Sequence, residues 1–328
     1  MLRSFFITIF FWSLLLANSQ TQAKELENYL QTLTCKAGEN FALHIHGGVT
    51  YRNRPKRDEI RKAFIRDLLI RGKIALEQGV SALDVISFTL TSMENSGEFN
   101  AGSGSIPNQA GYREMDASIM TGHNLKAGAV ASVQYVKNPI QAARYVMEET
   151  KNVLFVGASA DEFLKNKLAN ADFPTLPPSY ASTEDLSVKS PPHGTIGAVA
   201  LDLCGHIAAG TSTGGFGSKI PGRVGDSPII GAGTYANEEV GISASGHGEY
   251  FIRYAIAYDL SARMKYRGDK LNLATQDTIR DLTNAGGTGG VITVNKDGSI
   301  ASAFNTTGFI RGYVGSRYPE PTTISGPD

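Results

Sequence analysis

The feature that most constrains the fold is a succession of strand patterns in the second half of the chain. Each is a short segment rich in Val, Ile, Thr and Ala that ends at Gly or polar turn residues, which is typical of strands. The segments cover residues 195–203, 206–215, 228–237 and 240–248. A helical pattern follows over 249–266, and Asp297–Gly298 marks a later hairpin. Strands packed beside helices predict a layered α/β domain.

The first half of the chain mixes both kinds of element. Strand patterns cover 41–48, 115–122, 127–136 and 152–157, and helical patterns cover 57–79, 140–149 and 161–170. Ser81 with Asp84 three residues later marks the start of another helix, and Asn138–Pro139 opens the helix over 140–149. This mixture agrees with an α/β layered fold in which helices cover the strands on both sides.

The N-terminus has the parts of a secretory signal peptide. An apolar run from Phe5 to Leu16 precedes the small residues Thr21 and Ala23, at the spacing that signal peptidase prefers. We expect residues 1–23 to be removed and the mature protein to be exported, to a periplasm or to the outside; an uncleaved anchor is the alternative. Lys plus Arg and Asp plus Glu are 31 each, so neither nucleic acid nor an acidic membrane is an expected partner.

Neither the cysteines nor the histidine pair in the first strand indicates a disulfide framework or a metal site. Cys35 and Cys204 permit one disulfide but do not imply it. His44 and His46 alternate on one strand face without a Cys or carboxylate at ligand spacing. Core or loop histidines are therefore favoured over a metal site.

A possible nucleophile lies where an irregular segment meets the first strand of the second half. Residues 171–192 are rich in Pro, Ser and Thr and predict an exposed linker, after which Gly194 and Thr195 begin the strand. A Thr hydroxyl becomes a nucleophile when the α-amine of the same residue takes its proton, and this amine has a pKa of roughly 7.7–8.0. Thr195 gains a free amine only if the Gly194–Thr195 bond is cut. The alternative is an ordinary β-branched residue that starts a strand.

Motifs along nearly the whole expected mature chain carry a resemblance to a known family. They include "HGG" at 46–48, "FNAGSGS" at 99–105, "MDASIM" at 115–120, "NPIQAARYVME" at 138–148 and the long stretch from His193 to Asn237 with "TSTGG" and "GRVGDS". The chain resembles the plant-type L-asparaginase and isoaspartyl peptidase family of N-terminal nucleophile hydrolases. The resemblance implies cleavage between Gly194 and Thr195, with Thr195 as the catalytic nucleophile and Thr213 hydrogen-bonded to it.

The resemblance also implies how a substrate is held. Arg223 would bind the α-carboxylate and Asp226 the α-ammonium group, and this pairing agrees with the fork geometry of arginine and the charge of aspartate. Without the surrounding motif, a structural Arg–Asp ion pair is the alternative. Further positions that match the family are the oxyanion-stabilising pair Ser245–Gly246, the pocket residue Gly248, and Asn100 near the nucleophile. The family often has Thr where this chain has Ser245, and Ser keeps the hydroxyl.

A further implied site is a loop that wraps an alkali cation with main-chain oxygens, the ligands that hard cations favour. The matching residues are Met93, Glu94, Ser96, Phe99, Ala101 and Ser103. The expected ion is a structural sodium, and no cofactor is expected for catalysis.

The implied architecture is an αββα sandwich in which residues 24–194 form an α subunit and 195–328 a β subunit of one domain. Two such αβ heterodimers are expected to associate. The implied substrates are small: L-asparagine and β-aspartyl dipeptides, whose order of preference the sequence leaves open.

Two other functions compete with this one. Glycosylasparaginase shares "GRVGDSP" but has Asp before its Thr and "TNG" after it, whereas this chain has Gly194 and Gly214–Gly215. An exported ligand-binding module is the alternative from another class, because the Gly-rich loops could hold a ligand without chemistry. Such a module would remain a single uncut chain.

Overall fold

A computed structural model describes residues 40–51, 55–168, 194–217 and 219–326. The predicted signal peptide, Cys35 and the predicted linker over 171–192 lie outside the described residues. Removal of residues 1–23 and cleavage between Gly194 and Thr195 stay predictions. The described residues belong to one compact unit that begins at Asn40. No helix among them has the length and apolar character required to cross a bilayer.

The larger of two sheets has the strand order β12-β11-β1-β5-β6-β2-β3-β4. Its strands are β1 (Ala42–Thr50), β2 (Met115–Thr121), β3 (Ala127–Val133), β4 (Leu154–Val156), β5 (Ile196–Leu201), β6 (Ile207–Thr213), β11 (Gly308–Gly315) and β12 (Tyr318–Ile324). Neighbours are antiparallel except β3 and β4, which are parallel. The central strands β1, β5 and β6 are almost fully buried. Pro319 and Pro321 lie in the edge strand β12, where a missing N–H is tolerated.

The smaller sheet has the order β10-β9-β8-β7 and lies against the larger one. Its strands are β7 (Thr234–Ala236), β8 (Val240–Gly246), β9 (Gly289–Asn295) and β10 (Ile300–Phe304). An apolar cluster fills the space between the sheets and contains Val199, Ile207, Ile292, Val294 and Phe309. His44 and His46 are buried with it, and burial lowers the pKa of each to about 3. The interpretation as core histidines is confirmed.

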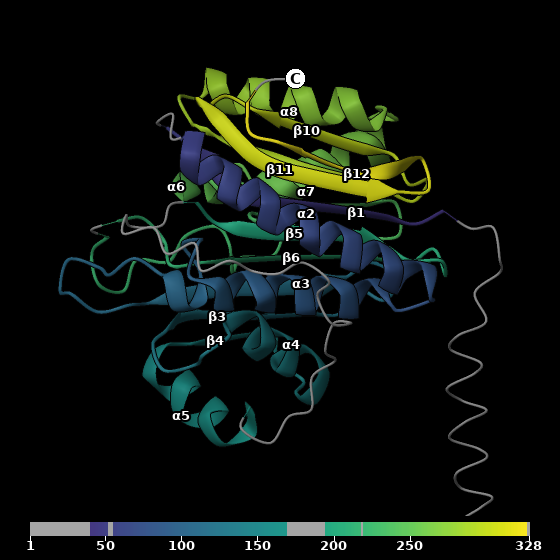
Figure 1. Cartoon of the computed structure of the whole chain (residues 1–328). Coiled ribbons are helices and arrows are strands. Elements are labelled where there is room, and N and C mark those ends of the chain that lie inside the picture. Colours follow the sequence, from purple (N-terminus) through teal and green to yellow (C-terminus); the bar gives the residue numbers. More distant parts are fainter. Residues whose placement is uncertain (1–39, 52–54, 169–193, 218, 327–328) are drawn as a thin grey trace, which may run out of the picture. The chain divides into compact units, whose positions relative to one another are not determined.

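Helices cover the outer face of each sheet (Figure 1). The larger sheet carries α2 (Pro55–Glu77), α3 (Ala82–Ser96), α4 (Pro139–Glu149) and α5 (Gly157–Leu168), and the smaller one carries α6 (Gly248–Arg253), α7 (Ile256–Ala262) and α8 (Leu271–Asn284). Ser81 caps α3 by accepting a hydrogen bond from the Asp84 N–H at 3.1 Å, as its motif predicts. The layer order helix–sheet–sheet–helix confirms the αββα prediction.

Two expected elements differ from the structure. The strand predicted over 228–237 is reduced to β7, because the Asp226 carbonyl accepts hydrogen bonds from the Ile229 and Gly233 N–H groups and closes a turn. The single helix predicted over 249–266 breaks at Ala255, whose φ is +46°. After α7 the chain forms a short π-helical turn over Arg263–Arg267.

Candidate active site

The antiparallel pairing of β5 and β6 brings the predicted nucleophile beside its predicted partner. Thr195 precedes β5, Thr213 ends β6, and Ile196 is paired with Ser212. The Thr195 hydroxyl donates a hydrogen bond to the Thr213 hydroxyl at 3.1 Å. Thr213 Oγ1 also accepts from the Gly215 N–H at 3.0 Å, which fixes its orientation. The nucleophilic oxygen is therefore held at a defined place.

Two glycines allow the chain to pass close by Thr195. Gly48 and Gly194 have φ values of +92° and +96°, in the left-handed region that favours glycine. A Cβ on Gly48 would collide with the Cα of Gly194, and one on Gly194 would lie 2.5 Å from the Gly47 carbonyl oxygen. The Asn100 N–H donates to the Gly194 carbonyl at 3.2 Å, so this carbonyl is polarised just before the predicted cleavage point.

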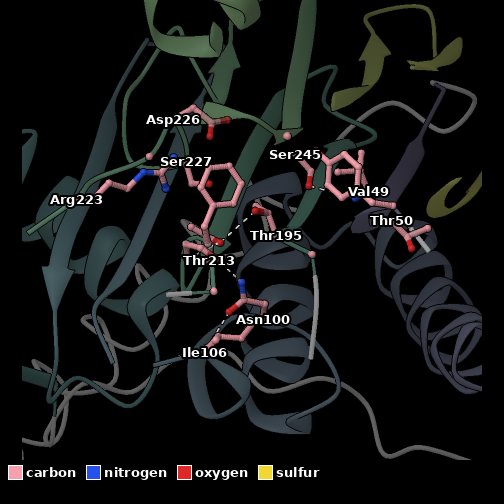
Figure 2. A pocket seen from close by; sticks show the side chains of 17 residues that line it. Val49, Thr50, Asn100, Ile106, Thr195, Thr213, Arg223, Asp226, Ser227 and Ser245 are labelled. Atoms are coloured by element: carbon pink, nitrogen blue, oxygen red, sulfur yellow. Dashed lines mark hydrogen bonds between the residues drawn. The ribbon is translucent and has the colours of Figure 1, made fainter. Parts of the chain in front are cut away.

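A cavity of about 340 Å³ opens above Thr195 (Figure 2). Arg223, Asp226 and Ser227 lie on one side of Thr195, and Val49, Thr50 and Ser245 lie on the other, with Asn100 and Ile106 below. Of the predicted site residues, those that line the cavity are Asn100, Gly194, Thr195, Thr213, Arg223, Asp226, Ser245 and Gly246. The tertiary structure thus brings these residues together from five separate stretches of the chain.

Arg223 occupies one wall of the cavity in a fixed orientation. Its Nε and Nη2 donate to the two carboxylate oxygens of Glu249, each at 3.0 Å, and its guanidinium lies 4.5 Å from the ring centre of Phe216. The hydrogen bonds from Arg223 lower the pKa of Glu249. Within the described residues Nη1 has no hydrogen-bond partner, so it can receive a carboxylate from the cavity.

Asp226 is a buried acid that faces the same side of the cavity. Its exposed fraction is 5 %, and its Oδ2 has no hydrogen-bond partner among the described residues. Burial raises the pKa of Asp226 to about 7. A buried carboxylate without a full set of donors is suited to pair with a cation that enters the cavity. Gly248 lies behind it rather than in the cavity lining, since a Cβ there would be 2.8 Å from Asp226 Oδ1.

Ser245 and Gly246 end β8 on the opposite side of Thr195. The Ser245 hydroxyl accepts a hydrogen bond from the Val49 N–H at 3.2 Å. This leaves its own O–H to donate into the cavity, as an oxyanion-stabilising group must.

If Ser245 is the oxyanion donor that the sequence predicts, Ser245→Ala should lower kcat about 10²-fold, because one donor to the developing oxyanion is lost. Steady-state kinetics on a β-aspartyl substrate checks this. Ser227→Ala is the matched control, since Ser227 lines the other side of the cavity, and its kcat should change much less. A wild-type kcat for Ser245→Ala would contradict the assignment.

Asn100 connects the loop after α3 to the nucleophile. Its Oδ1 accepts from the Ile106 N–H at 2.9 Å and its Nδ2 donates to the Gly215 carbonyl at 2.5 Å. The Gly214 N–H donates to the Asn100 carbonyl at 2.8 Å. Asn100 therefore ties this loop to the segment that follows Thr213.

The predicted cation loop surrounds a short 3-10 turn, η1 (Gly102–Gly104). Met93, Glu94 and Ser96 lie at the end of α3 rather than in a loop. The main-chain oxygens of Met93, Glu94, Phe99 and Ala101 accept hydrogen bonds from groups within residues 96–104. Each of these carbonyl oxygens keeps a second lone pair, so together they can still serve as ligands of a hard cation. The Glu94 side chain is buried and accepts from Ser212 Oγ at 2.6 Å and from the Ile140 N–H at 3.0 Å, and burial raises its pKa to about 7.

Some lining residues were not anticipated from the sequence. Val49, Thr50 and Tyr51 follow the "HGG" motif directly, and Phe216 follows "TSTGG". Glu249, which orients Arg223, is distant from it in sequence. Adjacency to a recognised motif was the available signal for the first four, while no local pattern marks Glu249.

Comparison with known proteins agrees with this geometry. A family model described as asparaginase matches residues 39–189 and 186–323. An isoaspartyl peptidase of Escherichia coli is 39% identical over 85% of this chain and 94% of its own length, and one of Salmonella typhimurium is 41% identical over 79% and 88%. An isoaspartyl peptidase/L-asparaginase of Bos taurus is 36% identical over 82% and 91%. A two-part match over nearly all of the described residues, together with these relatives, shows that the chain belongs to the asparaginase family.

Proposed function

We propose that this chain is an autoprocessing isoaspartyl peptidase and L-asparaginase with Thr195 as its nucleophile. The observation that carries the proposal is the Thr195 hydroxyl, oriented by Thr213 in a cavity that offers Arg223 and Asp226 on one side and Ser245 on the other. The names of the bacterial and bovine relatives support the substrate class: a β-aspartyl amide in a dipeptide or in L-asparagine.

Maturation would begin at the peptide bond before Thr195. The Thr195 hydroxyl attacks the Gly194 carbonyl carbon, the C–N bond breaks, and the proton moves from the hydroxyl to the departing nitrogen. The resulting ester between Gly194 and Thr195 Oγ1 is then hydrolysed by water. The products are a carboxylate at Gly194 and a free amine on Thr195, and the Asn100 N–H stabilises charge on the Gly194 oxygen.

Turnover would use the amine that maturation releases. The Thr195 amine takes the hydroxyl proton while Oγ1 attacks the side-chain carbonyl of the substrate, and the proton leaves with ammonia or with the amine of the released amino acid. Water activated by the same amine hydrolyses the β-aspartyl ester and yields L-aspartate. Ser245 and the Gly246 N–H are the proposed donors to the oxyanion in both steps.

Substrate recognition would require both the α-carboxylate and the α-ammonium group of the aspartyl residue to be free. Arg223 Nη1 binds the α-carboxylate while Glu249 holds the rest of the guanidinium, and ionised Asp226 binds the α-ammonium group. This arrangement selects an aspartyl residue with a free amino terminus.

We also propose further properties, whose support is the sequence and the family resemblance. These are removal of residues 1–23 with export to a periplasm or to the outside, an α subunit of 24–194 and a β subunit of 195–328, and association of two αβ heterodimers. A structural sodium ion at the main-chain oxygens of the segment from Met93 to Ser103 belongs to the same proposal.

Intact-mass spectrometry of the purified, denatured protein tests the proposal. We expect two fragments separated between Gly194 and Thr195, and release of L-aspartate from L-asparagine and from a β-aspartyl dipeptide. A chain that stays whole and binds amino acids without turnover would favour the binding module. Cleavage of glycosyl-asparagine with L-asparagine untouched would favour glycosylasparaginase.

A further inference from the structure

The loop between β6 and β7, which carries Arg223 and Asp226, also carries a buried lysine. Lys219 is 4 % exposed, and its Nζ donates to the main-chain carbonyl of Glu114 at 2.8 Å. It does not line the cavity. A lysine is almost never fully buried unless opposite charges balance it, so this one requires an account.

The balancing charges come from the start of β2. Asp116, which is fully buried, and Glu114 act on Lys219 electrostatically and favour its charged form, while burial and Arg223 oppose it and lower the pKa of Lys219 overall. In turn, Lys219 and Arg223 favour the ionised form of Asp116 against its burial. Lys219, Glu114 and Asp116 are buried, and the partly buried Arg223 is the second cation that acts on Lys219 and Asp116.

The two acids hold the loop at the points on either side of Arg223. The Glu114 carboxylate accepts from the Gly222 N–H at 2.9 and 3.1 Å, and the Asp116 carboxylate accepts from the Gly225 N–H at 3.4 Å. Asp116 is also the cross-strand partner of Thr213. The position of the loop relative to the nucleophile therefore depends on these two carboxylates.

Lys219 connects this cluster to the other end of the loop. A Cβ on Gly215 would lie 3.0 Å from Lys219 Nζ, and the Gly215 N–H is the group that orients Thr213. Replacing the ammonium by a neutral group would remove a positive charge that acts on two buried carboxylates, and such groups then take up protons or move toward water.

We propose that Lys219 is a positioning residue whose buried ammonium balances Glu114 and Asp116, and thereby sets the affinity of the Arg223 and Asp226 loop for the amino acid end of a substrate. The inference rests on the proposed function only in taking that loop as the substrate-binding one. Lys219 does not touch the substrate, so its effect should appear in binding rather than in chemistry.

The test is calorimetric titration with L-aspartate, beside kinetics on L-asparagine and intact-mass analysis. Lys219→Met should raise the Kd for L-aspartate and the KM at least about tenfold, with cleavage at Thr195 and kcat little changed. Lys219→Met combined with Asp116→Asn should recover part of the affinity, because the unbalanced charge is gone. Lys151→Met, at an exposed lysine after α4, is the matched control.

A Kd of Lys219→Met for L-aspartate equal to that of the wild type would overturn the inference. So would a double variant that binds L-aspartate no more tightly than Lys219→Met, because the loss would then come from packing rather than from charge. If Lys219→Met does not fold, Glu114→Gln serves instead; weaker L-aspartate binding supports the role and unchanged binding overturns it. A wild type that stays whole yet binds L-aspartate would refute the proposed chemistry and leave Lys219 open to the same titration. A wild type that does not bind L-aspartate would overturn the inference.

Discussion

Thr195→Ala is expected to remain a single chain and to lose hydrolysis by a factor on the order of 10⁴–10⁶. In the proposed mechanism the Thr195 hydroxyl attacks in both maturation and turnover. Thr213, its hydrogen-bond partner, cannot replace it because the Thr213 oxygen is held by the Gly215 N–H. Intact-mass spectrometry reads the first effect, and a coupled L-aspartate assay reads the second.

Thr195→Ser is the matched control because it keeps the hydroxyl and removes only the methyl group. It should still cleave and turn over, more slowly, since the serine rotamer is less restricted than that of threonine. Cleavage of Thr195→Ala between residues 194 and 195, or near wild-type hydrolysis by it, would refute Thr195 as the nucleophile.

Asp226→Asn is expected to lower kcat/KM about 10²–10³-fold, mainly through a higher KM. The variant keeps the shape of the side chain but removes the charge that pairs with the α-ammonium group. Asp297→Asn, at an exposed turn, provides the control for a lost carboxylate. A KM near that of the wild type would show that the ammonium group is bound elsewhere.

The raised pKa of Asp226 predicts how kcat/KM depends on pH. Burial raises the pKa of Asp226 to about 7, so the charged form that binds an ammonium group predominates only above this pH. For the free wild-type enzyme, kcat/KM should therefore fall as the pH drops through about 7. In the proposed mechanism the Thr195 amine, whose ordinary pKa is roughly 7.7–8.0, must also be unprotonated, so two groups contribute to this limb. Asp226→Asn should remove one of them, and the fall of log kcat/KM below pH 7 should become shallower by one proton. An unchanged slope in the variant would assign the second proton to another group.

The free energy of unfolding should change with pH in the opposite direction to kcat/KM. The folded-state pKa of Asp226 lies above its unfolded value of 3.8, so the native state favours the protonated form, and the stability this contributes is lost as the pH rises through about 7. Ligand-free Asp226→Asn should therefore have a higher Tm than the wild type at pH 8, and the difference should shrink toward pH 5. Thermal unfolding at both pH values checks this. An unchanged Tm at pH 8 would mean that Asp226 is solvated when charged.

Local interactions made several elements predictable from the sequence. The Ser81 cap of α3, the Pro at the start of α4 and the Asp297–Gly298 hairpin each depend on contacts within a few residues, and the structure has all three. The cap at α4 is only partly as expected, because the Asn138 side chain donates to Asn95 Oδ1 and does not bond to the helix. The Asp226 turn, which shortens β7, is also closed by nearby groups, but the sequence prediction took the apolar residues after Pro228 for a continuous strand.

By itself, the sequence determined the family and the identity of eight cavity residues, because long motifs with strict residue requirements surround Gly194 and Thr195. Only the tertiary structure decided that Glu249 holds Arg223, that Asp226 is buried with a raised pKa, and that Lys219 is buried near Glu114 and Asp116. The physical reason is that burial and pairing of charges depend on segments brought together across two sheets. Side chains far apart along the chain leave no periodic or local pattern that would predict such contacts.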